Sequence, residues 1–341
     1  MLLCEKAGLV KLGHVAIDGT KIKANASKHK AMSYARMTET EQRLKAEIDA
    51  LLKQAEDVDA AEDAQYGKGK RGDELPEELA RRESRLKKIA QAKAELEQEA
   101  REKAEQERAI AEAKLAERRD EEKRTGKKKR GREPKVPDPE KAAPEAKAQR
   151  NFTDADSRIM PDGANKGSFV QGYNAQAAVD ATAQVIVAAE VTQETTDNHQ
   201  LSPMLGQVKQ NLGRKPDAAS ADAGYWSEAN ATDESVAGID LHIATGRLKH
   251  EQTIETASEP PPVQATAKEA MRHKLRTEAG RSIYKMRKAI VEPVFGQIKE
   301  RRGFRRFSLR GLDNVRREWK LVCLTSNLLK LFGSGWTPQT A

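Results

Sequence analysis

Three carboxylates stand where the sequence could support chemistry. Asp18 and Asp222 each end a short apolar run next to a glycine, and Glu292 lies among apolar residues of a helical pattern. If the three side chains converge, they repel one another unless divalent cations lie between them, and oxygen-only ligands favour Mg²⁺ or Mn²⁺. Two such ions about 3.5–4 Å apart stabilise both the attacking and the leaving oxygen of a phosphoryl displacement. We therefore predict these carboxylates as catalytic, metal-binding residues for phosphodiester cleavage or strand transfer.

Each carboxylate also has a purely structural interpretation. Asp18 could form an Asp-Gly turn, and Asp222 could cap the helix that follows it. Glu292 could pair with Lys288 or Lys299. Taken singly, these roles are the more common ones, so the catalytic interpretation depends on finding all three carboxylates in this order along the chain.

The elements that must position these residues follow from apolar patterning. Alternating or continuous apolar runs predict strands over 14–22, 172–179, 185–192, 216–221 and 241–244. Residues 180–183 supply a turn, so the second and third strands form a hairpin. Helical spacing predicts helices over 198–212, from about 281 and from about 315. This order predicts an α/β fold with a mixed sheet flanked by helices, and the strand ends of open α/β sheets usually bind ligands.

The segment between the first two predicted strands is highly charged. An a/d seam with spacings of 4, 3, 4 and 3 runs through Leu44, Ile48, Leu51, Ala55 and Val58. A second helix is predicted over about 75–124, which completes a helical hairpin of coiled-coil type. The turn at 66–72 spells GxGxxG, but a charged helix precedes it instead of a strand, so we interpret it as a hinge. The basic run 127–132 and the prolines up to Pro144 indicate a linker.

Four stretches around the three carboxylates carry a family resemblance. They are residues 18–27, 172–180, 221–227 and 281–299. Here the chain resembles the DDE transposases of bacterial insertion sequences, which have an RNase H-like catalytic domain. The resemblance implies metal-dependent strand cleavage and strand transfer with two Mg²⁺ or Mn²⁺ ions. It also implies that Asp18, Asp222 and Glu292 are the first, second and third metal ligands.

The resemblance also implies a domain organisation. Residues 1–35 hold the first strand region of the catalytic domain, 36–150 are the helical-hairpin insertion with its basic linker, and 151–341 hold the remainder of that domain. Such transposases usually carry a helical DNA-binding domain before the first catalytic aspartate. Only 17 residues precede Asp18, so we expect that domain to be absent. The hairpin could then serve as an arm for DNA or for a second subunit.

Residues near Glu292 are predicted to contact DNA. Related transposases carry a Tyr-x₂-Arg-x₃-Glu-x₆-Lys signature, which Tyr284, Arg287 and Lys299 match except that four residues separate Arg287 from Glu292. The basic stretch that follows is predicted to bind the phosphate backbone, and it contains Arg301, Arg302, Arg305, Arg306 and Arg310.

Aromatic residues occur both within this basic stretch and beside Asp222. Phe304 and Phe307 interleave with the arginines and could stack on an unpaired base. Tyr225 and Trp226 are expected to be core residues. The predicted partners are transposon-end and target DNA and a second copy of the chain, in a homodimer.

Composition limits the class of protein. The 341 residues contain 61 Lys+Arg and 53 Asp+Glu, which gives a net charge of +8, and the aromatic share is 4 %. These values indicate a sizeable solvated segment outside any core. There is no apolar run of membrane-spanning length, so a cytoplasmic, nucleoid-associated protein is expected. Cys4 and Cys323 lie too far apart in sequence to suggest a disulfide framework or a zinc site.

Two other functions fit the same residues. The chain could be a truncated relic that binds DNA or a partner transposase through its hairpin without catalysis. It could also be a metal-dependent nuclease that cuts DNA without joining strands.

Overall fold

The chain is divided into two compact units. The computed structural model describes residues 1–66, 77–129, 131–163, 167–246, 257 and 265–337. Met1–Lys28 and Asp156–Ala341 form one unit, called here the sheet unit, and His29–Ala155 form the other, called the helical unit.

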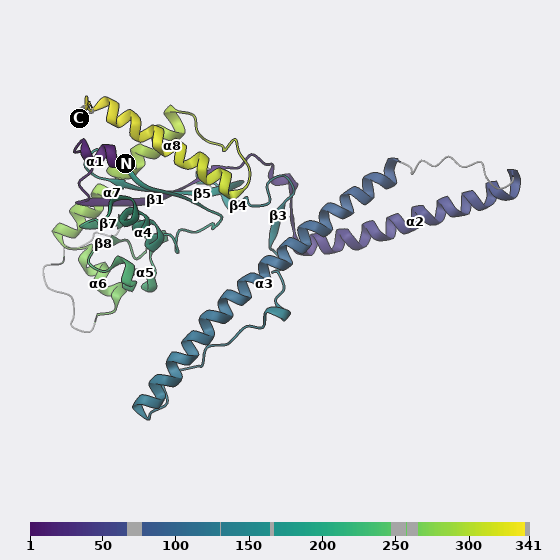
Figure 1. Ribbon diagram of the computed structural model, residues 1–341, viewed down its shortest axis with the longest axis horizontal. Coiled ribbons are helices and arrows are strands. Elements are labelled where there is room, and N and C mark those ends of the chain that lie inside the picture. The colour runs from purple at the N-terminus through teal and green to yellow at the C-terminus, as the bar shows by residue number, and fades with distance from the viewer. Residues whose placement is uncertain (67–76, 130, 164–166, 247–256, 258–264, 338–341) are drawn as a thin grey trace. The chain divides into compact units, whose positions relative to one another are not determined.

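A mixed β-sheet forms the centre of the sheet unit (Figure 1). Its strands are β1 (His14–Lys23), β4 (Arg158–Pro161), β5 (Phe169–Asp180), β6 (Ile186–Thr192), β7 (Ala218–Ala221) and β8 (Asp240–Ile243). Their order is β6-β5-β1-β7-β8, and β4 pairs with the first residues of β5 on the same side as β6. The β1 strand is antiparallel to β5 and parallel to β7, and β7 is parallel to β8. The predicted β5–β6 hairpin is confirmed.

Helices cover both faces of this sheet. They are α1 (Leu2–Lys6), α4 (Leu201–Leu212), α5 (Glu228–Thr232), α6 (Ala267–Lys274), α7 (Glu278–Gly296) and α8 (Leu312–Gly333), with short turns η3 (Ala223–Tyr225), η4 (Glu234–Val236) and η5 (Gln297–Arg301). Successive side chains of a strand point to opposite faces. Val15 and Ile17 of β1 accordingly pack with α4, whereas Ala16 packs with α7 and α8. The prediction of an α/β fold with a mixed sheet flanked by helices is therefore confirmed.

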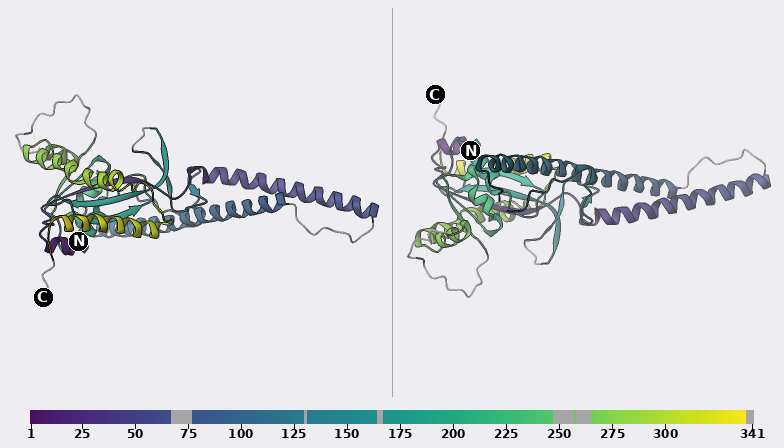
Figure 2. Two further views of the ribbon diagram at one scale, coloured as in Figure 1. Left: turned by 90° about the horizontal axis from the view of Figure 1, so that it is seen from above. Right: turned by 90° about the horizontal axis from the view of Figure 1, so that it is seen from below.

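The helical unit is built on two long helices. They are α2 (Tyr34–Tyr66) and α3 (Glu77–Thr125), and the unit also contains η1 (Lys28–Lys30, shared with the end of the sheet unit), β2 (Ala31–Ser33), η2 (Pro139–Lys141) and β3 (Gln149–Asn151). The helices lie side by side over part of their length, as the views in Figure 2 agree. Their shared core is small, and Met37, Leu44, Ile89 and Leu96 are its main members. The predicted hinge at 67–72 lies outside the described residues.

An ion-pair network joins β3 to α3. The buried Arg150 guanidinium pairs with Glu95 at 2.8 Å and with Glu99 at 2.6 Å. Elsewhere the helices carry i,i+4 pairs such as Lys45–Glu41. Because solvated pairs of this kind support a helix without a core, the charged composition is compatible with long helices that bury little apolar surface.

Two histidines, one half-buried and one buried, make the sheet unit sensitive to acid. Burial lowers the pKa of both His14 on β1 and His242 on β8. His242 lowers the pKa of His14 further, and Lys274 lowers that of His242, whereas Asp180 and Asp240 oppose these shifts. The unfolded chain gains a proton at each histidine as the pH falls through about 6.5, whereas the folded chain resists protonation. The resulting stability is present above that pH and is lost as the pH falls below it.

We therefore expect His14→Gln to reduce the fall in unfolding temperature between pH 7.5 and pH 5.5. His199→Gln is the matched control, because His199 is exposed. Calorimetry at both pH values checks this, and an unchanged difference in the His14 variant would contradict the role of that histidine.

Candidate catalytic site

Asp18 and Asp222 lie at matching positions of neighbouring parallel strands. The last pair of the β1–β7 ladder is Ala16–Ser220, and each carboxylate stands two residues further along its chain. Since side chains alternate between faces, both fall on the same face of the sheet, beside each other where β7 ends. The two predicted aspartates are thus brought together.

Asp18 lies inside β1, in agreement with the strand predicted over 14–22. The apolar run ends at Asp18, but β1 continues to Lys23, and Asp18 and Gly19 pair with Ala177 and Gln176 of β5. The Asp-Gly turn interpretation is therefore wrong. Asp222, by contrast, does cap a helical turn, since its Oδ1 accepts a hydrogen bond from the N–H of Gly224 at 2.8 Å.

Asp18 is a partly buried carboxylate that lies near one cation and two other aspartates. Its Oδ1 accepts from the N–H of Gly19 at 2.8 Å, and its Oδ2 accepts from Nη1 of Arg287 at 3.1 Å. Burial raises the pKa of Asp18 to about 6, and repulsion from Asp222 and Asp197 adds to this, whereas the Arg287 charge opposes it. A cation beside Asp18 and Asp222 would relieve that repulsion.

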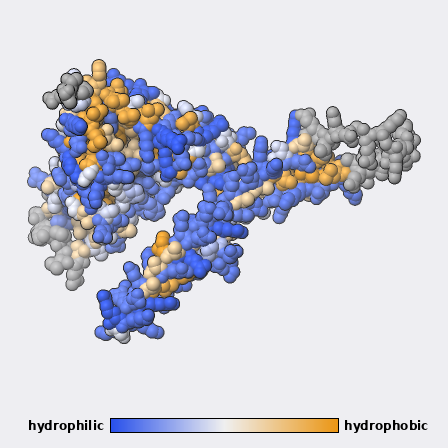
Figure 3. All heavy atoms as spheres, in the orientation of Figure 1, coloured by the Kyte–Doolittle hydropathy of each residue, from blue (hydrophilic) through white to orange (hydrophobic). Residues whose placement is uncertain are grey.

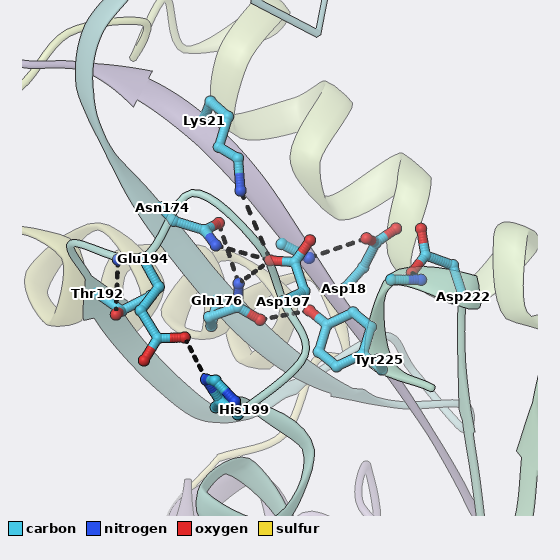
Figure 4. A network of polar contacts seen from close by, with 12 residues as sticks. Asp18, Lys21, Asn174, Gln176, Thr192, Glu194, Asp197, His199, Asp222 and Tyr225 are labelled. Carbon is cyan, nitrogen blue, oxygen red and sulfur yellow. Dashed lines mark hydrogen bonds and ion pairs between the residues drawn. The ribbon is translucent and has the colours of Figure 1, made fainter. Parts of the chain in front are cut away.

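Asp197 is a site residue that the sequence pattern did not indicate. It lies in the loop between β6 and α4 (Figure 4). Its Oδ1 accepts from the side-chain amides of Asn174 at 2.6 Å and Gln176 at 2.7 Å, and it lies 3.6 Å from Nζ of Lys21. The sequence does contain a hint of a polar site, because Asn174 and Gln176 alternate with apolar residues in the same strand. Asp197 itself carries no such hint, since it resembles an ordinary polar residue before a helix.

The two glycines that follow Asp18 and Asp222 leave room for Asp197. A Cβ on Gly19 would lie 2.7 Å from Oδ1 of Asp197, and a Cβ on Gly224 would lie 3.5 Å from its Oδ2. Close approach of this carboxylate to the backbone of β1 therefore depends on the missing side chain of Gly19, whereas the distance at Gly224 is an ordinary van der Waals contact. The three aspartates occupy one region of the sheet edge.

Tyr225 and Trp226 support this region from the core. Tyr225 is fully buried, and its hydroxyl donates to Oε1 of Gln176, the residue whose amide nitrogen holds Asp197. Trp226 is partly buried against the same core. Their predicted role as core residues is confirmed.

The structure does not place the Glu292 side chain beside Asp18 and Asp222. Glu292 is exposed on α7, whereas Arg287, Val291 and Val294 of that helix are buried. Glu292 stands five positions after Arg287, which places their side chains about 140° apart around the helix axis. Within the described parts of the chain Glu292 forms no hydrogen bond or ion pair, so neither Lys288 nor Lys299 is its partner. Its role as third ligand stays a prediction.

Arg287 and Tyr284 form a pair beside Asp18. The guanidinium lies 5.8 Å from the centre of the Tyr284 ring. Arg287 is buried, and its Nε finds no hydrogen-bond partner among the described residues. These contacts indicate that Arg287 holds Asp18 in place, and its predicted contact with DNA remains untested.

Some arginines of the predicted basic stretch already form hydrogen bonds or ion pairs within the sheet unit. Arg302 donates to the backbone of Val322 at 3.0 Å and Arg305 pairs with Glu300, so these two guanidiniums are already engaged within the sheet unit. Arg310 is likewise engaged, with the backbone of Asn25.

Three other basic residues are differently placed. Arg301 and Arg306 are exposed and have no ion pair within the described ranges. Lys299 is half-buried, and burial together with nearby Arg305 lowers its pKa. Arg301 and Arg306 are therefore the members of the stretch most available to a ligand.

The stacking role considered for Phe307 is wrong. Phe307 is fully buried and packs edge-on against Tyr173 and Phe304, with ring centres 5.8 and 5.4 Å apart. Phe304 is half-buried and stacks on Trp319. Both rings anchor the basic stretch to the core instead of facing a base.

The carboxylates present suit a hard divalent cation in chemical type. Asp18 and Asp222 offer oxygen ligands, as Mg²⁺ and Mn²⁺ prefer. Burial is the main cause of the raised pKa of Asp18, and repulsion from Asp222 adds to it. The part of the chain that the structure describes contains no group of three acidic, histidine or cysteine side chains already arranged around a metal position.

One comparison with known proteins bears on this site. Residues 246–332 match the family model of a transposase DDE domain. The match supports a DDE transposase, and with it DNA as a partner and a polynucleotidyl-transferase type of enzyme. It covers α6, α7, η5 and most of α8, and therefore includes Tyr284, Arg287, Glu292 and the basic stretch. No curated protein and no solved structure matches the chain significantly. No helix among the described residues is long and apolar enough to cross a membrane.

Proposed function

We propose that this protein is a DNA transposase that cleaves and joins DNA strands at the ends of an insertion sequence. The observation that carries the proposal is the juxtaposition of Asp18 and Asp222 on neighbouring strands of a chain whose residues 246–332 match a transposase DDE domain. The strand order β6-β5-β1-β7-β8 is compatible with an RNase H-like catalytic domain. In this proposal residues 36–150 are an insertion after the first strand of that domain.

Each residue of the site has a role in the proposed reaction. Asp18 and Asp222 would hold two Mg²⁺ or Mn²⁺ ions, with Glu292 as the third ligand that the family resemblance implies. When bound, these ions supply Lewis-acid stabilisation of the attacking and leaving oxygens. Arg287 positions Asp18 through its 3.1 Å hydrogen bond, and Asp197 supports the strand edge through Gln176.

Metal-dependent DNA cleavage tests the proposal. The substrate is a supercoiled plasmid that carries the DNA flanking the protein's own gene, incubated with Mg²⁺, Mn²⁺ or EDTA. We expect nicking with either metal, none with EDTA, and joined products that contain the freed 3′ end. Cleavage without joining would indicate the nuclease function, and DNA binding without cleavage would indicate the non-catalytic relic.

A separate prediction concerns the phosphate contacts. Arg306→Gln is expected to weaken binding to duplex DNA and to lower the slope of log affinity against log salt by about 1, because one phosphate contact is lost. Arg317→Gln is the matched control, since Arg317 is an exposed arginine of α8 outside the predicted set. Fluorescence anisotropy over a salt series measures both. Equal slopes in the two variants would remove Arg306 from the DNA interface.

A further inference from the structure

The outer face of α8 is apolar where a surface helix is normally polar. Five large apolar side chains are exposed there, with exposed fractions of 58 % for Leu321, 49 % for Leu324, 48 % for Leu328, 63 % for Leu329 and 87 % for Phe332. We call this set the α8 stripe. Figure 3 shows hydrophobic side chains gathered on this part of the sheet unit. Contiguous exposed apolar patches of this kind usually mark interaction sites.

Hydrogen bonds on the inner face of α8 fix the rotation of the helix. The Asn327 side chain both donates to and accepts from the backbone of Ile186 on β6, at 2.8 Å each way. Trp319 is fully buried, and its indole N–H donates to the backbone oxygen of Gln176 at 3.0 Å. Turning the α8 stripe inward would break these buried hydrogen bonds, so the leucines are held outward by the fold.

The α8 stripe has almost no charge within it. Residues 321–329 contain no acidic or basic side chain. Lys330 is turned toward the β5–β6 turn, where its Nζ donates to the backbone of Ala183 at 3.0 Å and to Gln184 at 3.3 Å. Arg302, whose guanidinium donates to the backbone of Val322 and to the hydroxyl of Thr325, is a charged neighbour of the stripe. A partner must therefore present a mainly apolar surface.

The patch continues onto α1. The Sγ of buried Cys4 lies 3.9 Å from the backbone oxygen of Asn327, which places α1 against α8. Leu2 and Leu3 of α1 are exposed, at 59 % and 51 %. Leu2 and Leu3 therefore add two exposed apolar side chains on the helix that packs against α8.

We propose that the α8 stripe, extended by Leu2 and Leu3, is the surface through which two copies of this chain associate. A second copy offers the mainly apolar surface that is required. The spacing of 3, 4 and 4 along Leu321, Leu324, Leu328 and Phe332 suits the seam of a helix pair.

The size of the surface also fits a dimer. Covering the seven side chains buries on the order of 600 Å² per copy, close to the roughly 800 Å² per partner of a standard interface. Neighbouring backbone and rim residues supply the remainder. The inference does not depend on the proposed catalytic function.

Sedimentation velocity on the full chain at micromolar concentrations tests this. The wild type is expected to be a dimer. The double variant Leu324→Glu/Leu328→Glu is expected to weaken association at least about 100-fold, because two charges per copy would enter an apolar interface. The matched control is Leu309→Glu/Ile110→Glu, which changes two exposed apolar residues outside the stripe and should leave the dimer intact.

Folding is checked separately by circular dichroism and thermal unfolding. If the double variant does not fold, Phe332→Ser replaces it, since Phe332 is the most exposed member of the stripe, and about a tenfold weaker dimer is expected. A monomeric wild type, or a dimer that the folded stripe variant leaves unchanged, overturns the proposal. A monomeric wild type that sediments with phosphatidylcholine vesicles through the stripe also overturns it and assigns the surface to lipid.

Discussion

Asp18→Asn and Asp222→Asn are each expected to lower metal-dependent DNA cleavage by at least about 10³-fold. Either change removes one of the two carboxylates that the structure places side by side, while the amide keeps the size of the side chain. A loss of about 4 kcal/mol of transition-state stabilisation corresponds to a factor of this size. Plasmid nicking rates at saturating Mg²⁺ measure it.

Asp217→Asn is the matched control for both variants. Asp217 is an exposed aspartate just before β7, at the opposite end of the strand from Asp222. The Asp217→Asn variant should cleave DNA at the wild-type rate. If Asp18→Asn or Asp222→Asn retained most of the activity while remaining folded, the assignment of that carboxylate to the reaction would be wrong.

The same plasmid-nicking assay shows which carboxylate is the third metal ligand. Glu292→Gln is expected to cause a comparable loss if Glu292 is a ligand, as the family resemblance implies. A fully active Glu292→Gln variant beside an inactive but folded Asp197→Asn variant would instead assign that role to Asp197, which the structure places close to the other two aspartates.

Gly172→Ala is expected to lower the free energy of unfolding by about 2–3 kcal/mol. A Cβ at this position on β5 would lie 2.5 Å from the backbone oxygen of Ile22 on the central strand β1. Backbone on a paired strand cannot move aside as a side chain can, so the added methyl group strains the sheet next to the site.

Gly206→Ala is the control with the same chemical change. Gly206 lies inside α4, where nothing approaches within 4 Å of an added Cβ. This variant should gain about 0.5–1 kcal/mol, because alanine favours the helix. Urea unfolding followed by fluorescence compares the two variants, and equal stabilities would show that the β1–β5 backbone contact is less close than described.

Most strands could be predicted because the residue pattern that marks a strand lies within a short segment of the chain. Small and β-branched residues mark β1, β5, β6 and β7, and the predicted and observed bounds differ by only a few residues. The short strand β4 was not predicted, since Arg158–Pro161 has too few apolar residues to distinguish it from a loop. It forms because the first residues of β5 offer it a pairing edge.

The site was predictable only in part. Asp18 and Asp222 could be identified because each follows an apolar run and is followed within two residues by a glycine. Asp197 could not, since its hydrogen bonds to Asn174 and Gln176 span more than twenty residues of chain and exist only once β5 and the β6–α4 loop have met. The orientation of Glu292 depends on which face of α7 packs on the sheet.

By itself, the sequence determined the α/β class, the β5–β6 hairpin and the position of two aspartates after apolar runs, because strand patterns are carried by short segments. Tertiary structure alone decided which side chains meet or face water. Asp18 pairs with Arg287 across 269 residues, and Phe307 enters the core while the leucines of α8 stay outside it. These outcomes depend on how helices rotate as they pack, and packing between distant segments sets that rotation.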